Sequence, residues 1–284
     1  MRATTPGWGG SASAGHCRCG HGAPSARGAS ATTWAGRGHR DLGLDIGPHP
    51  HIGLQTVTWL LTGEVLHRDS LGTEQVVAPG QLNLMTAGRG LSHSEEATGA
   101  YRGEVHGMQL WVAQPEHTRT GEPAFEQLAD LPVIELDRTP PPCWSASSPA
   151  PSAPRHDSPL LGADLALRPG TTVVPLSPGF EHALVVLEGA VTVDDRLLEP
   201  GRLGYLGRSR DELVLSVAEP TRALLLGGEP LDEPVVMWWN FVARGREELD
   251  QAYADWDGSS ERFGTVASAL PRVPAPRPVW RRPG

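Results

Sequence analysis

Two short pairs of side chains carry the chemistry that this sequence offers. His49 and His51 lie two positions apart, and His93 and Glu95 repeat that spacing with an imidazole and a carboxylate. On a β-strand, residues two apart point to the same face of the sheet. Two such pairs on facing strands of a small barrel would bring three neutral nitrogens and one carboxylate to one point. That ligand set suits a first-row divalent metal, and positions left open to water favour Fe(II)-type oxygen chemistry over a closed structural zinc site.

Other histidines and cysteines have simpler interpretations. A single His-x-His pair is more often a pair of surface histidines, and it is the occurrence of two same-face pairs in one block that favours a metal site. His67 and His106 also fall in predicted strands, where we interpret them as neighbours of the site or as ordinary polar residues. The run from Gly15 to His21 (GHCRCGH) looks like a metal-binding tract, but we attribute it to composition and not to a zinc site.

The two pairs lie in a block that is predicted to form many short strands. Apolar or alternating runs recur about every 8–12 residues and are separated by glycine and proline, which is typical of a β-sandwich or barrel. Alternating strands and helices, as in a parallel α/β sheet, are absent from this pattern. The strands are expected at residues 55–61, 64–69, 74–78, 81–85 and 106–113.

A second β-rich block runs from residue 160 to about residue 227. Residues 61–82 and 187–203 share the pattern L-x-G-x-V followed by P-G-x-L, a weak internal repeat that predicts two copies of one β unit. The alternative is that this pattern recurs by chance in β proteins. One amphipathic helix is predicted at residues 244–256. Its apolar face comprises Leu249, Ala252, Tyr253 and Trp256.

These elements predict a chain of several parts. Residues 1–40 are rich in Gly, Ala, Ser and Arg, and we expect an irregular segment without a packed element. Residues 41–137 would form the metal-binding domain, and the Pro/Ser-rich residues 138–157 a linker. Residues 158–264 would form a second domain that includes the helix. The Pro/Arg-rich residues 265–284 are expected to be extended or disordered.

Composition excludes several functions. The 284 residues carry a formal net charge of -9, which argues against binding a phosphate backbone as the main task. All 24 cationic side chains are arginine, so a lysine Schiff base is ruled out. The three cysteines are too few for a disulfide scaffold and indicate a reducing compartment. With no secretory pattern and no long apolar stretch, we expect a soluble cytoplasmic protein. Because two β blocks are fused in one chain, we expect a monomer.

The region around the two pairs resembles a known family. Residues 47–63 (GPHPHIGLQTVTWLLTG) look like the first metal motif of the cupin superfamily, and closely like that of the pirin family. Residues 67–72 (HRDSLG), 85–95 (MTAGRGLSHSE) and 106–111 (HGMQLW) continue the match in order. The resemblance implies an all-β bicupin, in which two jelly-roll barrels pack together and a short C-terminal helix follows. In such a protein the first barrel holds one Fe(2+) and the second is metal-free. The ligands would be His49, His51, His93 and Glu95.

The resemblance also implies an activity and an alternative to it. The first is quercetin 2,3-dioxygenase activity, in which a flavonol and O2 are the substrates and Glu95 accepts a proton. The alternative is a non-enzymatic regulator, whose iron redox state controls the binding of a protein partner. The acidic charge fits a protein partner better than direct nucleic-acid contact. A third possibility is a degenerate, metal-less relative.

The N-terminal segment departs from the family pattern. Pirins have an aromatic-rich run before the first histidine pair, and residues 1–40 lack it. One permitted set of codons for residues 26–35, read in another frame, gives Trp-Cys-Phe-Gly-Asp-His-Leu-Gly, which resembles the missing run. Residues 143–151 can be read in a shifted frame as a plausible strand. We therefore hypothesise that both segments are frame-shifted, and gene sequence incompatible with the second frame would refute this.

Overall fold

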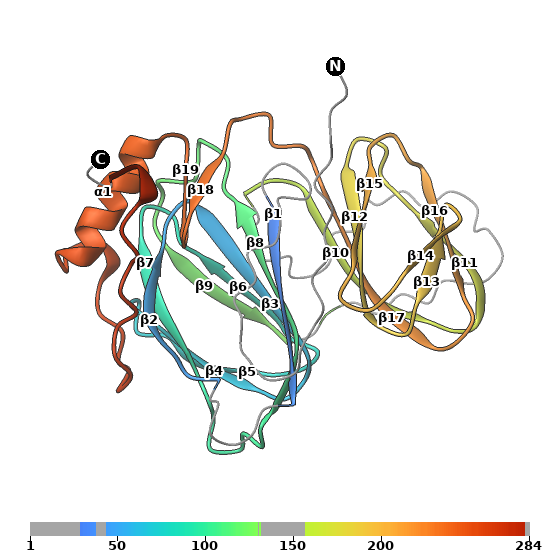
Figure 1. Ribbon diagram of the computed structural model, residues 1–284, viewed down its shortest axis with the longest axis horizontal. Coiled ribbons are helices and arrows are strands. Elements are labelled where there is room, and N and C mark those ends of the chain that lie inside the picture. Colours follow the sequence, from blue (N-terminus) through green and yellow to red (C-terminus); the bar gives the residue numbers. More distant parts are fainter. Residues whose placement is uncertain (1–28, 38–43, 130, 132–156, 282–284) are drawn as a thin grey trace.

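Two β-barrels lie side by side in the computed structural model, and a helix lies on the far side of the first barrel (Figure 1). The structure describes residues 44–129, 131 and 157–281, and of residues 29–37 it describes the backbone alone. The predicted all-β fold of two cupin jelly-roll barrels with a short C-terminal helix is confirmed. No described helix is long and apolar enough to cross a membrane.

The first barrel is made of two antiparallel sheets, with strand orders β1-β8-β3-β6-β9 and β2-β7-β4-β5. The five strands predicted here from the sequence are confirmed, and their ends differ by at most two residues. The strands are β1 (Ala29–Arg37), β2 (Ile46–His51), β3 (Leu54–Thr62), β4 (Val65–Asp69), β5 (Glu74–Val77), β6 (Leu82–Thr86), β7 (Leu91–Glu96), β8 (Glu104–Ala113) and β9 (Ala124–Leu128).

Strand β1 differs from the expectation for residues 1–40. Its backbone pairs antiparallel with β8, from Ala29 opposite Val112 to Arg37 opposite Glu104. The prediction of no packed element is therefore wrong for residues 29–37. Pairing uses backbone N–H and C=O groups, which almost every residue supplies, so a strand can form without the aliphatic side chains that we looked for. The rest of that segment and residues 143–151 of the frame-shift hypothesis lie outside the described residues.

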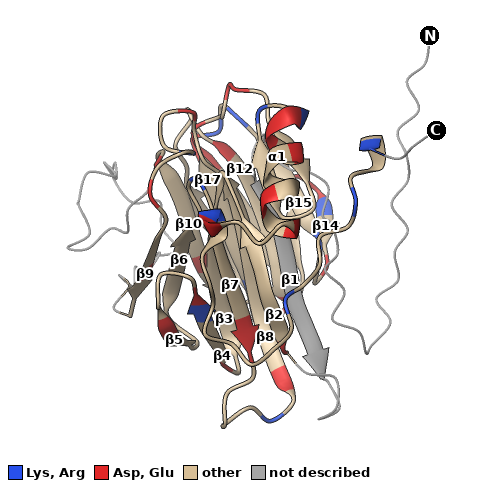
Figure 2. Cartoon of the chain, turned by 90° about the vertical axis from the view of Figure 1, so that its left-hand side faces the viewer, with Lys and Arg blue, Asp and Glu red and all other residues tan. Residues whose placement is uncertain are grey.

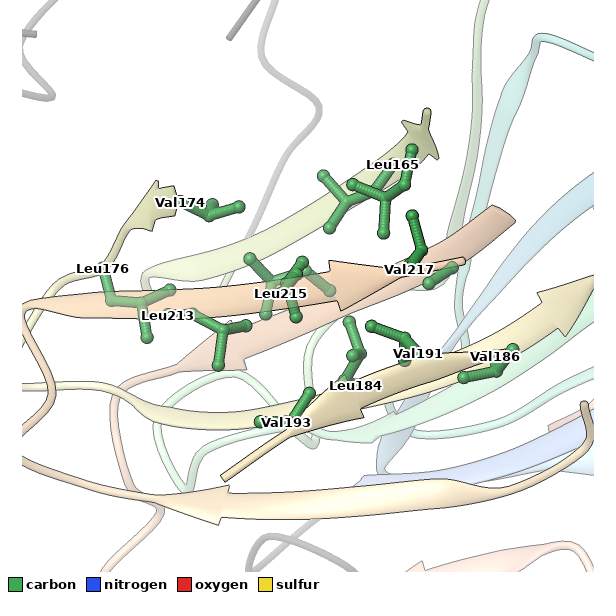
Figure 3. Packing of buried hydrophobic residues seen from close by; sticks show 13 residues of the cluster. Leu165, Val174, Leu176, Leu184, Val186, Val191, Val193, Leu213, Leu215 and Val217 are labelled. Carbon is green, nitrogen blue, oxygen red and sulfur yellow. The ribbon is translucent and has the colours of Figure 1, made fainter. Parts of the chain in front are cut away.

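The second barrel repeats the two-sheet arrangement, with strand orders β10-β17-β12-β15 and β11-β16-β13-β14. Its interior is filled by aliphatic side chains from both sheets, among them Leu184, Val186, Leu213 and Leu215 (Figure 3). Alternation along β12 sends Leu184 and Val186 into this core. The strands are β10 (Leu160–Leu167), β11 (Gly170–Pro175), β12 (Glu181–Glu188), β13 (Val191–Val193), β14 (Arg196–Leu198), β15 (Leu203–Gly207), β16 (Glu212–Val217) and β17 (Thr221–Gly228).

The opposite face of β12 joins the two barrels. Val185 and Leu187 form one buried cluster with Leu61 and Met108 of the first barrel. A polar contact adds to this apolar interface, because the indole Nε1 of Trp59 donates to the Asp164 carboxylate at 2.8 Å. Burial of apolar area is the main stabilising term in such interfaces. The two barrels therefore share an apolar boundary.

The C-terminal segment returns to the first barrel. Helix α1 buries Leu249 and Trp256 in a cluster with Ile52 and Phe241, and Ile52 and Phe241 also form a backbone bridge. Acidic residues, red in Figure 2, recur along α1, and Glu247 and Glu248 lie in its first turn. The elements are β18 (Val236–Trp238), β19 (Phe241–Ala243), α1 (Arg246–Asp257) and the 3-10 turns η1 (Glu261–Phe263) and η2 (Val279–Arg281).

The segment between η1 and η2 forms neither helix nor strand, and it is held against the barrel through its main chain. The backbone N–H of Val273 donates to the carbonyl of Pro48 at 2.9 Å, and Trp256 Nε1 donates to the carbonyl of Val273 at 2.9 Å. A side chain at Gly47 is excluded, because a Cβ there would lie 2.0 Å from the carbonyl oxygen of Pro271. The tail thus covers the outside of the strand that carries the first histidine pair.

Candidate metal centre

Strands β2 and β7 bring the predicted ligands together. They pair antiparallel, with His49 directly opposite His93 and His51 opposite Leu91. The register shifts between Ile46 and His49, and this irregularity sets His49 beside His93. Because residues two apart share a face, both members of each predicted pair point into the first barrel.

The three imidazoles are buried and meet at one point. Ligand atoms from His49, His51 and His93 all lie within 4.8 Å of one another. The Nε2 atoms of His51 and His93 are 3.1 Å apart, and the side chains are 7%, 0% and 1% exposed in chain order. The prediction that these three histidines converge is confirmed.

Backbone carbonyls fix the orientation of two of the rings. The Nδ1 atom of His49 lies 3.0 Å from the carbonyl oxygen of Gly47, and the Nδ1 atom of His51 lies 3.1 Å from that of Asn240. A carbonyl oxygen can only accept, so each Nδ1 carries the hydrogen and each Nε2 keeps its lone pair. This is the usual arrangement of histidines that bind a metal through Nε2.

Burial also keeps the imidazoles neutral. It lowers the pKa of His49 to about 4, against an increase caused by the hydrogen bond to Gly47. The pKa values of His51 and His93 fall well below 6.5, first because of burial and then because of the neighbouring imidazoles. Neutral imidazole is the form that binds metal, so no proton has to leave at neutral pH. The donor set present in the chain therefore fits a divalent first-row ion.

Glu95 lies in the same interior but is held differently. Its carboxylate accepts a hydrogen bond from Gln109 Nε2 at 2.5 Å. Among the described residues, the close group of ligand atoms contains the three histidines and does not include Glu95. Burial raises the pKa of Glu95 to about 7, and the hydrogen bond from Gln109 opposes that rise. Its role as a metal ligand stays a prediction. Glu96 faces the other way, where its carboxylate accepts from Ser94 and Arg68.

A small cavity lies between the two sheets of the first barrel beside this cluster. His93 and Glu95 line it from β7, and His67 lines it from β4. The facing sheet lines it from β3, β6 and β9. The other lining residues are Thr56, Thr58, Val65, Val77, Asn83, Met85 and Phe125.

Sequence reasoning missed two residues of the site. Gln109 lies on β8 at the spacing that turns it inward, and the alternation of that strand could have shown this. Asn240 comes from the loop between β18 and β19, and no sequence signal links it to His51.

Two other histidines lie outside the site. His106 lies away from it, where its Nδ1 is 3.7 Å from Glu188. His182 is buried in the second barrel, and neither ring nitrogen has a hydrogen-bond partner among the described residues.

Two jelly-roll barrels in one chain, with a buried histidine cluster in the first that could hold a metal ion, define a two-barrel cupin. The sequence matches the Pirin family over residues 26–112 and the Pirin C-terminal cupin domain over residues 162–264. The chain belongs to the pirin family.

Relatives of known sequence or structure agree with this assignment. A Pseudomonas aeruginosa protein, provisionally named a quercetin 2,3-dioxygenase, is 44% identical over 84% of this chain and 76% of its own length. A pirin-like protein of Caulobacter vibrioides is 37% identical over 75% of each chain. The crystal structure titled quercetin 2,3-dioxygenase from Acinetobacter baumannii has a TM-score of 0.75 and 38% identity, and covers 84% of this chain and 81% of that one.

Proposed function

We propose that this chain is a metal-dependent flavonol 2,3-dioxygenase that uses one Fe(2+) ion. The observation that carries the proposal is the convergence of His49, His51 and His93, buried and with their ligand atoms within 4.8 Å. Relatives named for quercetin 2,3-dioxygenase activity support the substrate class. Glu95 is proposed as the fourth ligand, as the proton acceptor, or as both in turn.

A bound metal would supply a Lewis acid that lowers the pKa of a coordinated hydroxyl, and a redox centre for O2. The chain's own residues do the rest. The three histidines offer neutral nitrogens. Because they are buried, bulk water does not compete with a metal for these nitrogens. In the metal-free site the pKa of Glu95 is raised to about 7, close to neutral pH. Glu95 is therefore suited to take the proton from the flavonol 3-hydroxyl.

Gln109 keeps the Glu95 carboxylate in place. The amide oxygen of Gln109 accepts a hydrogen bond from Trp111 Nε1 at 3.3 Å, which turns its NH2 group toward Glu95. A donor to a carboxylate stabilises the charged form. Gln109 therefore favours the ionised Glu95 that can accept a proton, and it is a positioning residue in the proposed reaction.

The size of the cavity favours a second candidate. Pockets for molecules of flavonol size hold several hundred cubic ångströms, whereas the side chains of both sheets leave a cavity of about 10 Å³, room for about one water molecule. A regulator that senses the redox state of its iron and binds a protein partner needs no such pocket. A flavonol, in contrast, requires the side chains at the cavity to move.

Anaerobic reconstitution with Fe(II), followed by addition of quercetin and O2, separates these candidates. The dioxygenase predicts O2 uptake and carbon monoxide release, both lost in His93→Ala and kept in His182→Ala, the matched change in the second barrel. Bound iron without turnover favours the regulator. Failure to bind any metal favours a degenerate relative. Light scattering of the same sample tests the expected monomer.

A further inference from the structure

His67 and Asp69 lie beside the metal centre without belonging to it. Both are buried on β4, whose pairing with β7 sets Asp69 opposite His93 and His67 opposite Glu95. His67 Nε2 lies 3.1 Å from Asp69 Oδ2, and His67 Nδ1 lies 3.4 Å from His93 Nδ1. A chain of contacts therefore runs from a carboxylate, through one imidazole, to a second imidazole at the proposed centre.

The carboxylate sets the direction of these hydrogen bonds. The backbone N–H groups of Leu71 and Thr73 donate to Asp69 Oδ1 at 2.9 and 3.0 Å. Ionised carboxylate oxygens only accept, so Oδ2 takes the hydrogen of His67 Nε2. In a neutral imidazole the other nitrogen is then an acceptor, so His67 Nδ1 can only receive a hydrogen from His93 Nδ1. That leaves His93 Nε2 with a lone pair that faces the lone pair of His51 Nε2 at 3.1 Å, an arrangement that suits one ion bound by both nitrogens and not a hydrogen bond between them.

Packing fixes the imidazole ring of His67, which links Asp69 to His93. The imidazole of His67 stacks on Phe125, with ring centroids 4.5 Å apart and an angle of 20° between the planes. Both nitrogens of His67 are engaged, so it has none to offer a substrate. Its place in the fold suits positioning, not proton transfer to or from a substrate.

We propose that Asp69 and His67 form a relay that fixes the tautomer and orientation of His93, so that His93 Nε2 is ready to bind metal. The proposal rests on the metal centre proposed above. His49 and His51 take the same orientation from backbone carbonyls, whereas His93 depends on side chains that substitution can change. Partners of this kind change metal affinity by about 10- to 100-fold when removed.

Asp69→Asn tests the relay with little change of shape. If its amide oxygen keeps the bonds from the Leu71 and Thr73 backbone, its NH2 group faces His67 and donates where the carboxylate accepted. His67 would then carry its hydrogen on Nδ1 and force that of His93 onto Nε2. We expect the affinity of the full-length protein for Co(II), measured by competition with a chromophoric chelator, to fall by about 10- to 100-fold.

Two further variants keep the test independent of folding defects. His67→Gln can still accept from His93 and donate to Asp69, and is expected to bind Co(II) nearly as well as wild type. His67→Leu can do neither, and is expected to lose affinity as Asp69→Asn does. Thermal unfolding of each metal-free variant, compared with His182→Leu, shows whether it is folded. Co(II) binding by His67→Leu and Asp69→Asn at wild-type affinity would overturn the relay.

The tautomers can be measured without metal. Two-bond ¹H–¹⁵N correlation spectra of the metal-free full-length protein should show His93 protonated on Nδ1 and His67 protonated on Nε2, and Asp69→Asn should reverse both. His93 protonated on Nε2 in the wild type would refute the relay. The predicted tautomers in a wild-type protein that binds no metal would support the relay's hydrogen bonds and refute the metal centre.

Discussion

Acidifying the metal-free protein tests the burial of the three site histidines. The pKa of His49 is lowered to about 4 in the folded state, and those of His51 and His93 lie well below 6.5. The unfolded chain, whose histidines titrate near 6.5, takes up protons that the folded site refuses. Stability is therefore lost as the pH falls through about 6.5, by about 1 kcal/mol per histidine between about pH 6.5 and about pH 5.5.

Glu95 acts in the opposite direction. Its pKa is raised to about 7 in the folded state, against 4.5 for the ordinary side chain. Over the same range the folded protein holds a proton that the unfolded chain lacks, which adds about 1 kcal/mol of stability. The three histidines together cost about 3 kcal/mol, so the net loss is about 2 kcal/mol. Glu95→Gln removes the opposing contribution and increases the loss to about 3 kcal/mol.

Urea unfolding, followed by tryptophan fluorescence in the presence of a chelator, measures the loss of stability on acidification in the wild type and in Glu95→Gln. His182, whose pKa is also lowered by burial, adds its own share of acid sensitivity. His182→Leu is therefore the matched control. In proteins that carry this change, Glu95→Gln should still increase the loss of stability on acidification by about 1 kcal/mol. Stability that is flat or rises on acidification of Glu95→Gln would refute the assignment of buried, neutral imidazoles.

Other substitutions test separate parts of the fold and site. Gly47→Ala should loosen the C-terminal tail, whose main chain a Cβ would meet, and speed proteolysis of that tail, whereas Gly162→Ala, with open space around it, should not. Leu184→Ala should lower the free energy of unfolding by about 2–5 kcal/mol in denaturant titrations, because it opens a cavity in the second core. Gln109→Leu should raise the pKa of Glu95 and move the acidic limb of the flavonol turnover profile to higher pH; an unmoved limb would exclude Glu95 as the proton acceptor.

The site was predictable where it depends on spacing within a strand. Alternation alone sends His49 and His51 to one face of their strand, and His93 and Glu95 to one face of theirs. Their convergence also needs the pairing of β2 with β7. Asn240 was not predictable, because its contact with His51 depends on how a segment 189 residues later returns to the barrel. The role of His67 depends on the pairing register of two strands, which the sequence does not state.

Composition misled the prediction at the N-terminal end of the chain and did not show the contacts of the C-terminal end. Strand β1 forms through backbone pairing with β8, which a count of aliphatic residues does not detect. The proline- and arginine-rich tail suggested extension or disorder, yet it is held by the Val273 backbone bond to Pro48 and by Arg272, whose guanidinium lies 3.7 Å from the ring centre of Trp256. A cation over an aromatic ring stabilises such a segment without any aliphatic core.

The account is tested most directly by the metal content of the full-length protein after anaerobic reconstitution with Fe(II) and removal of free ions. The histidine cluster predicts one bound ion per chain in the wild type and in His182→Ala, and loss of that ion in His49→Ala and His93→Ala. A wild-type protein without bound iron, or a His93→Ala protein that keeps it, would contradict the proposed centre.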